Sequence, residues 1–88
     1  MKEIIDILEQ ILVDPTKRES LVKDFQKRVG DPNFEAPEKE TKVCTDLAYK
    51  MENYEPEEEV RIEDSSLFGD DKLIVEVEKA LSKLNKDK

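Results

Sequence analysis

The 88-residue chain contains no histidine and no tryptophan, a single cysteine and only two glycines. Without histidine, imidazole general acid–base catalysis and imidazole metal ligation are both excluded, which removes the commonest kinds of hydrolase. The lone Cys44 can form no internal disulfide and no cysteine-based zinc site. Because it lies on the apolar stripe of a predicted helix, we expect a packed core thiol rather than a nucleophile.

Long apolar runs are also missing, since no wholly apolar stretch exceeds three residues. Nothing in the sequence is therefore expected to span a membrane. The apolar residues near the start are interrupted by Asp6, Glu9 and Gln10, so no signal peptide is expected either. Together with the single cysteine, these features predict a small cytoplasmic protein.

Charge, by contrast, is abundant. The chain has 23 acidic and 15 basic side chains and a formal net charge of −8. A protein of this sign repels nucleic acid and anionic membranes and is attracted to basic partners, so direct nucleic-acid binding is not expected. Only 36% of the residues are hydrophobic, and a chain of this length builds one modest core. We therefore expect residues 1–88 to form a single domain.

Apolar residues at helical spacing predict four amphipathic helices, and the chain has little material for hairpins. The first apolar stripe stops at Asp14-Pro15, a pair that predicts the N-cap and first position of the second helix. Gly30 predicts the end of that helix and Pro37 the start of the third. The last helix is expected to begin after Gly69. An all-α fold, an antiparallel four-helix bundle, buries four such stripes together.

The connection between the third and fourth helices, residues 55–69, is long for a compact bundle. Connections of this length are commonly functional or disordered. Four large apolar residues favour order in this one: Val60, Ile62, Leu67 and Phe68. Pro56 followed by three glutamates is typical of a helix start, whereas the alternation from Glu59 to Glu63 is typical of an extended edge. A short helical turn and an extended edge both stay open.

The net charge of the chain is concentrated in this connection and its two ends. Residues 52–71 contain nine acidic side chains and one basic side chain, whereas the rest of the chain has fourteen of each sign. Such a run is often only a solvated face. Concentrating like charges in one segment lowers the stability of the fold through self-repulsion, however. The concentration therefore favours a functional surface, one whose carboxylates dock on a basic cleft in place of phosphates. The carboxylates expected to bind this partner are Glu52, Glu55, Glu57, Glu58, Glu59, Glu63 and Asp64.

Tyr54 lies within this acidic segment and has two alternative roles. It either caps the core at the end of the third helix or presents an aromatic anchor to the partner, and we include it among the partner-binding residues. No dedicated metal site is expected, because the segment lacks the ligand spacing and central glycine of an EF-hand. A bundle this small also offers no deep cleft for a catalytic carboxylate pair. The sequence thus predicts a protein that is not an enzyme and uses no cofactor.

Several motifs of the C-terminal half occur together in a known family. They are Cys44-x-x-Leu47, the string Met51–Glu57, Asp70-Asp71-x-Leu73-x-x-Glu76-Val77, and Leu81-x-Lys83. The most specific is the pattern of acidic, aromatic and Glu-Pro residues between Glu52 and Glu57. In these motifs and their order, the chain resembles the colicin D immunity protein family from Cys44 to Lys83. The N-terminal half shares only size and helical character with that family.

The resemblance implies a small acidic helical protein that protects a bacterium from its own toxin. In that family the toxin is a ribonuclease domain that cuts the anticodon loop of arginine transfer RNAs. The immunity protein plugs the basic active cleft of this domain with carboxylates that mimic phosphates. Related immunity proteins accompany toxins of contact-dependent growth inhibition systems. By position, the two principal inhibitory carboxylates fall on Glu52 and Glu57, the latter in place of an aspartate. The implied partner is a cognate basic toxin nuclease domain, and the chain is expected to be a monomer or to form a 1:1 complex with this domain.

The chain departs from the family pattern in two places. Its acidic run continues through Glu58 and Glu59, and residues 65–68 have no counterpart. These residues either set which toxin is recognised or pin the connection to the bundle. Two further functions stay open. One is an acidic nucleic-acid mimic that inhibits another DNA- or RNA-binding protein. The other is a helical interaction subunit that binds through apolar side chains such as Leu67 and Phe68.

Overall fold

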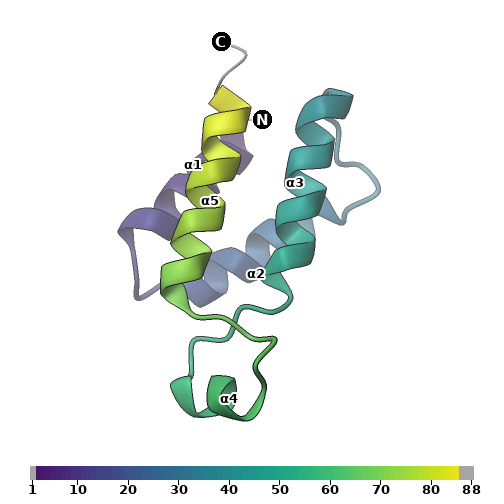
Figure 1. The fold of residues 1–88 in the computed structure, drawn as a ribbon. Coiled ribbons are helices and arrows are strands. Elements are labelled where there is room, and N and C mark those ends of the chain that lie inside the picture. Colours follow the sequence, from purple (N-terminus) through teal and green to yellow (C-terminus); the bar gives the residue numbers. More distant parts are fainter. Residues whose placement is uncertain (1, 86–88) are drawn as a thin grey trace.

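A computed structural model describes residues 2–85, which form five α-helices and no strand (Figure 1). The helices are α1 (Lys2–Val13), α2 (Arg18–Val29), α3 (Glu38–Met51), α4 (Glu58–Glu63) and α5 (Asp70–Asn85). The predicted all-α fold is therefore confirmed for this part of the chain. None of the helices described has the length and apolar character that crossing a membrane requires.

The four longer helices pack so that each contacts two others. Helix α1 contacts α2 and α5, and α3 contacts the same two helices. In Figure 1, α3 and α5 lie side by side at the front, and α1 and α2 cross behind them obliquely. The result is a compact helical globule with a Cα radius of gyration of 12.9 Å. The regular antiparallel four-helix bundle that the sequence predicts is not confirmed by this arrangement.

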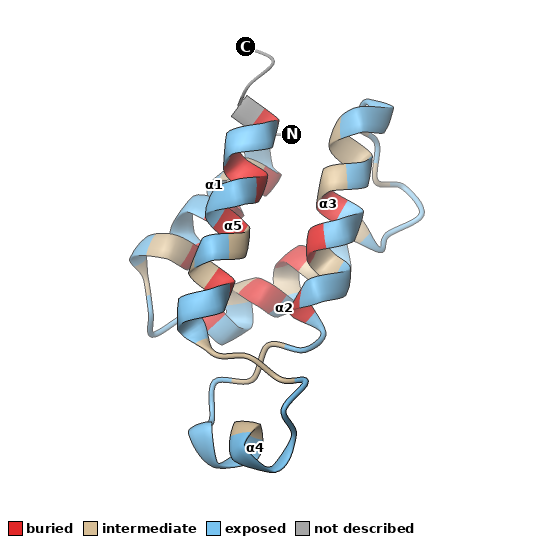
Figure 2. Ribbon diagram, in the orientation of Figure 1, coloured by how far each residue is buried: buried red, intermediate tan, exposed pale blue. Residues whose placement is uncertain are grey.

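Apolar side chains from the four longer helices meet in one core, and α4 contributes no buried residue (Figure 2). The core consists of Ile4, Ile7, Leu8, Ile11, Val22, Phe25, Cys44, Leu47, Met51, Leu73, Val77, Ala80, Leu81 and Leu84. Most of these positions repeat at the three- and four-residue spacing that puts side chains on one helix face. Cys44 is 1% exposed, and burial raises the pKa of its thiol to about 11, so the thiol stays protonated at neutral pH. The packed core thiol predicted for Cys44 is confirmed.

Glycine and proline mark three helix ends as the sequence predicts. Helix α2 stops immediately before Gly30, α3 starts immediately after Pro37, and α5 starts immediately after Gly69. Local backbone preference decides the ends at Gly30 and Pro37, because proline suits the entry of a helix and glycine suits its exit.

The predicted start of α2 at Pro15 is wrong, because the helix begins at Arg18. Asp14 organises a separate turn instead of capping the helix. Its Oδ1 accepts a hydrogen bond from Thr16 Oγ1 at 2.7 Å, and its carbonyl oxygen accepts one from Lys17 N at 3.3 Å. The bond from the Thr16 hydroxyl also holds the pKa of Asp14 below its usual value. With its carboxylate occupied in this way, Asp14 leaves the first turn of α2 uncapped.

Candidate functional site

Residues 55–68 form a closed loop that projects from the helical body, and we call this loop the acidic lobe (Figure 1). Two backbone hydrogen bonds join its ends. Glu55 N donates to Phe68 O at 2.9 Å, and Phe68 N donates to Asn53 O at 2.9 Å, which makes an isolated parallel bridge between Tyr54 and Phe68. Inside the loop, residues 58–63 form α4. Of the two alternatives left open by the sequence, the short helical turn is correct.

The acidic lobe exposes most of its carboxylates to solvent. Glu57, Glu58, Glu59 and Glu63 are exposed, and no basic side chain of the described residues forms an ion pair with them. Asp64 is exposed as well, and its Oδ1 accepts hydrogen bonds from the backbone N and the Oγ of Ser66 at 2.9 and 2.7 Å. The bond from the Ser66 hydroxyl is the main reason that the pKa of Asp64 lies below its usual value. The lobe therefore carries a group of uncompensated negative charges.

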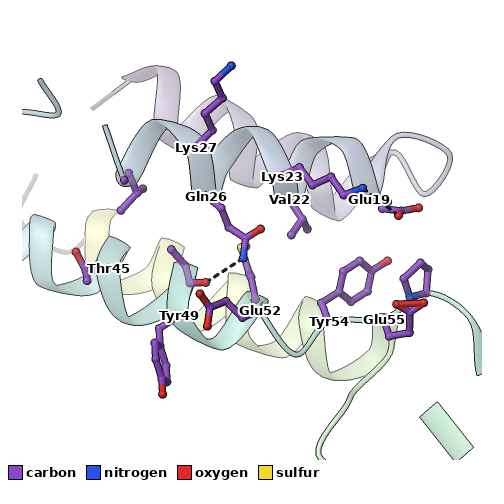
Figure 3. Close-up of a pocket in the computed structure, with 15 residues that line it drawn as sticks. Glu19, Val22, Lys23, Gln26, Lys27, Thr45, Tyr49, Glu52, Tyr54 and Glu55 are labelled. Atoms are coloured by element: carbon purple, nitrogen blue, oxygen red, sulfur yellow. Dashed lines mark hydrogen bonds and ion pairs between the residues drawn. The ribbon is translucent and has the colours of Figure 1, made fainter. Parts of the chain in front are cut away.

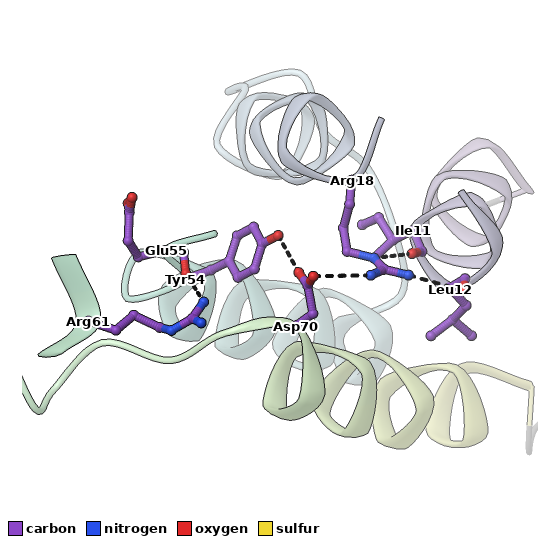
Figure 4. Close-up of polar contacts among 7 residues, drawn as sticks. All are labelled: Ile11, Leu12, Arg18, Tyr54, Glu55, Arg61 and Asp70. Carbon is purple, nitrogen blue, oxygen red and sulfur yellow. Dashed lines mark hydrogen bonds and ion pairs between the residues drawn. The ribbon is translucent and has the colours of Figure 1, made fainter. Parts of the chain in front are cut away.

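Arg61 is the one basic residue of the lobe, and it points inward. Its Nη1 donates a hydrogen bond to the carbonyl oxygen of Glu55 at 2.7 Å (Figure 4). The guanidinium also lies against Gly69, where a Cβ would overlap Nη1 and come within 2.7 Å of Cζ. Gly69 thus leaves the space that the guanidinium occupies at the base of the lobe, where residues 52–55 and 68–70 join it to the helical body; we call this part the neck. Arg61 therefore supports the neck and, in the described part of the chain, forms no ion pair with the surface carboxylates.

Tyr54 lies at the neck, half-buried between the lobe and the body. Its ring is 6.2 Å from the ring of Phe68, and its hydroxyl donates a hydrogen bond to Asp70 Oδ1 at 2.6 Å (Figure 4). Burial, followed by the hydrogen bond and the negative charge of Asp70, raises the pKa of Tyr54 well above its usual value. The phenol is therefore a neutral donor in an intramolecular contact. This geometry agrees with the role of a cap at the helix end.

Arg18 extends this contact into the body and was missed by the sequence analysis. It is 6% exposed, and its Nη1 lies 3.5 Å from Asp70 Oδ2. Its Nε donates to Ile11 O at 2.7 Å and its Nη2 to Leu12 O at 3.3 Å, two carbonyl groups in the last turn of α1 (Figure 4). No signal in the sequence indicated this role, because the sequence places the start of the helix at Pro15, and only the structure puts Arg18 at the first position.

The remaining predicted residues lie on the body side of the lobe. Glu52 is exposed at the C-terminal end of α3, and Glu55 is half-buried as the first residue of the lobe. The predicted partner-binding residues thus form two groups. Five exposed carboxylates lie on the lobe, and three residues lie at its neck: Glu52, Tyr54 and Glu55.

The apolar residues of the lobe divide between the core and solvent. Phe68 packs against the core, and Lys72 Nζ lies 5.4 Å from the centre of its ring. Of the two open roles for residues 65–68, this packing supports pinning the connection to the body. Ile62, in contrast, is 77% exposed among the carboxylates of α4. A docking surface built on Phe68 therefore has less support than one that uses α4.

In the described part of the chain, no three acidic or cysteine side chains are grouped so that they could hold a metal ion. Comparisons with protein-family models, with curated proteins and with solved structures find no match for this chain. The features that bear on function are therefore the charge and geometry of the acidic lobe and its neck.

Proposed function

We propose that this chain is an immunity protein, which inhibits a toxin nuclease by inserting the acidic lobe into the basic active-site cleft. One observation carries the proposal: within residues 2–85 the exposed carboxylates of the lobe form no ion pair, and Arg61, the one cation of the lobe, points inward. A nuclease cleft holds the phosphate backbone of its substrate with lysine and arginine side chains. Carboxylates on a projecting loop offer the same charge to the same cations. The resemblance of Met51–Glu57 to the colicin D immunity family supports this assignment.

Glu52 and Glu57 are the central contacts in this proposal. Glu57 is exposed at the residue before α4, where the lobe is free to enter a cleft. Glu52 is exposed on the body side of the neck, so a partner that meets both residues covers the neck. Glu58, Glu59, Glu63 and Asp64 add negative charge around Glu57 and attract a basic partner before contact. Tyr54 and Glu55 complete the surface at the neck.

The helical body serves as a support in this mechanism and needs no catalytic group. A single lobe fills a single cleft, so the inhibited complex contains one copy of each protein. Protection of the cell that makes the toxin requires the inhibitor where the toxin finds its substrate, which for transfer RNA is the cytoplasm. The proposed partner is a basic nuclease domain, and the chain itself binds no nucleic acid.

Co-expression tests this function. The probe is the basic C-terminal domain of a large protein encoded next to this chain, produced with and without the chain in a growing bacterium. We expect the wild-type chain to restore growth and Glu57→Lys to abolish the protection, because a reversed charge meets the cations of the cleft. Glu9→Lys is the matched control, since Glu9 is exposed on α1 and the change in net charge is the same.

Each outcome of this test decides between the candidate functions. Equal loss of protection with both variants would contradict a local role for the lobe. A chain that leaves the toxicity unchanged would overturn the immunity function. If that chain also bound unrelated basic nucleic-acid-binding proteins with similar affinity, the acidic nucleic-acid mimic would replace the immunity protein as the supported function. Binding that survives high salt and depends on apolar residues would instead indicate a helical interaction subunit.

A further inference from the structure

A groove of about 470 Å³ lies between α3 and α5, the two helices at the front in Figure 1. We call it the basic groove, because five lysines and two carboxylates are found among the described residues that line it. The lining therefore carries a net charge of +3, in a chain whose net charge is −8. This sign is opposite to that of the acidic lobe.

The lysines without an ion pair lie toward the end of the basic groove that is far from the lobe. Lys42 belongs to the first half of α3, and Lys79 and Lys83 to the second half of α5, the ends of both helices that lie opposite α4 in Figure 1. All three are exposed and form no ion pair within residues 2–85. Nearer the lobe, Lys50 Nζ is 3.0 Å from Glu76 Oε2, so this lysine is already paired.

Tyr49 adds an exposed aromatic ring to the basic groove, which it lines, and is 74% exposed. Figure 3 shows its ring pointing away from the neighbouring space between α2 and α3. Gln26 spans that space, where its Nε2 donates a hydrogen bond to Ala48 O at 3.2 Å (Figure 3). Val43 also lines the basic groove and is half-buried. The groove thus has accessible apolar side chains as well as lysines.

The acidic lobe has the complementary composition. Glu58, Glu59 and Glu63 of α4 are exposed and form no ion pair within the described part of the chain. Ile62, between them on the same short helix, is 77% exposed. An exposed isoleucine among carboxylates matches a groove in which lysines accompany an exposed tyrosine, in charge and in apolar area.

Within one chain, the lobe does not reach these lysines. It projects beyond the end of α3 and the start of α5, whereas the lysines lie toward the other ends of the two helices (Figure 1). The bridge between Tyr54 and Phe68 also ties its base to the neck. A lobe that occupies the basic groove must therefore come from a second copy of the chain.

We propose that the basic groove binds the acidic lobe of a second copy, so that the protein self-associates through lobe and groove. Carboxylates of α4 meet Lys42, Lys79 and Lys83, and Ile62 packs against Tyr49. Because both copies are acidic and the ion pairs are exposed, we expect weak association, with a dissociation constant of about 0.1–1 mM. This self-association does not depend on the proposed function. If the lobe also enters a toxin cleft, the toxin and the second copy compete for it.

Sedimentation equilibrium of the purified chain tests the proposal, between about 0.05 and about 1 mM protein. The average mass of the wild type should rise above that of the monomer across this range. Two double variants, Lys42→Gln with Lys79→Gln in the groove and Glu58→Gln with Glu59→Gln in the lobe, should each raise the dissociation constant about tenfold, as loss of two exposed ion pairs does. The lobe variant should do so even though it is less negatively charged overall, which general repulsion does not explain.

Lys23→Gln with Lys27→Gln is the control for the groove variant. It removes the same charge from two exposed lysines of α2 that do not line the basic groove, and it should associate as the wild type does. A control that loses association to the same extent as the groove variant would show a general charge effect and overturn the proposal.

An equimolar mixture of the groove variant and the lobe variant identifies the occupant. The first keeps its lobe and the second keeps its groove, so the mixture should associate more strongly than either variant alone. A mixture no heavier than the separate variants overturns the proposal, as does a wild type that stays monomeric. If that monomer binds a short RNA and the groove variant does not, the basic groove is a phosphate site instead. Melting curves show that each variant is folded, and the mass of the wild type still decides should one unfold.

Discussion

Tyr54 shows how a single residue in an interaction motif can serve the fold. Its hydroxyl, Asp70 and the buried Arg18 form a chain of polar contacts that links the neck of the acidic lobe to α5, α2 and the last turn of α1. Among the described residues, no buried side-chain nitrogen or oxygen lacks a partner, so the network satisfies the groups that it buries. Removing the hydroxyl of Tyr54 takes one hydrogen bond from the partly exposed Asp70 carboxylate, which keeps its ion pair with Arg18.

We therefore expect Tyr54→Phe to lower the free energy of unfolding by about 1–2 kcal/mol, because the bond from its hydroxyl goes to a carboxylate. Affinity for the toxin domain should change little, since the hydroxyl is occupied inside the chain. Urea denaturation and a binding titration of the same sample measure the two effects. Tyr49→Phe, at an exposed hydroxyl, is the control and should leave stability unchanged. Lost affinity with unchanged stability would show that the Tyr54 hydroxyl contacts the partner.

At the scale of elements, the acidic lobe is a short helix in a loop that the backbone closes upon itself. Helix α4 has six residues and none of them is buried, so it has little packing of its own. An isolated helix of this length is not stable in water. The bridge between Tyr54 and Phe68 and the bond from Arg61 to Glu55 O must therefore hold the lobe in shape.

Arg61→Ala is predicted to loosen the lobe and leave the body intact. The variant removes the donor to Glu55 O and the guanidinium that fills the space beside Gly69. Amide hydrogen exchange at Glu55 and Phe68, whose N–H groups form the bridge, should become about tenfold faster or more, as local opening allows. Core amides of α5 should exchange as before. Arg28→Ala, an exposed arginine of α2, is the control, and equal protection at the bridge in both variants would contradict the role of Arg61.

At the scale of the whole molecule, the charge is polarised. Residues 52–71 carry a net charge equal to the −8 of the entire chain, and the structure gathers most of these residues in one projecting lobe and its neck. The molecule measures 39 Å along its longest axis, several times the distance over which physiological salt screens charge. A basic partner is therefore attracted by the lobe and not by the molecule as a whole.

This uneven distribution of charge predicts that salt changes mainly the rate at which the chain associates with the toxin domain. Between about 50 and about 500 mM NaCl, the association rate with the basic toxin domain should fall about tenfold or more, while the dissociation rate changes much less. Stopped-flow mixing measures both rates. In the double variant Glu58→Lys, Glu59→Lys the dependence of association on salt should be shallower, because the field of the lobe is weaker. A salt effect confined to dissociation would contradict steering by the lobe.

The local features of this protein follow from the sequence alone. The stripes of apolar residues, together with Gly30, Pro37 and Gly69, predict the longer helices and three of their ends, because these depend on backbone preference and neighbouring side chains. The position of the excess negative charge is a property of the sequence itself. Asp14 shows the limit of such reasoning, since the sequence favours it as a helix cap, whereas its carboxylate binds Thr16 in the structure.

Only the tertiary structure decides what depends on residues far apart in the chain. The bridge from Tyr54 to Phe68, the burial of Arg18 beside Asp70 and the groove between α3 and α5 all join segments with no periodic or motif signal between them. Arg61 illustrates the reason. By sequence it belongs to the acidic surface, but its guanidinium turns inward, where the neck supplies a carbonyl acceptor and Gly69 leaves space. Such pairings are set by how helices pack, which local preference does not encode.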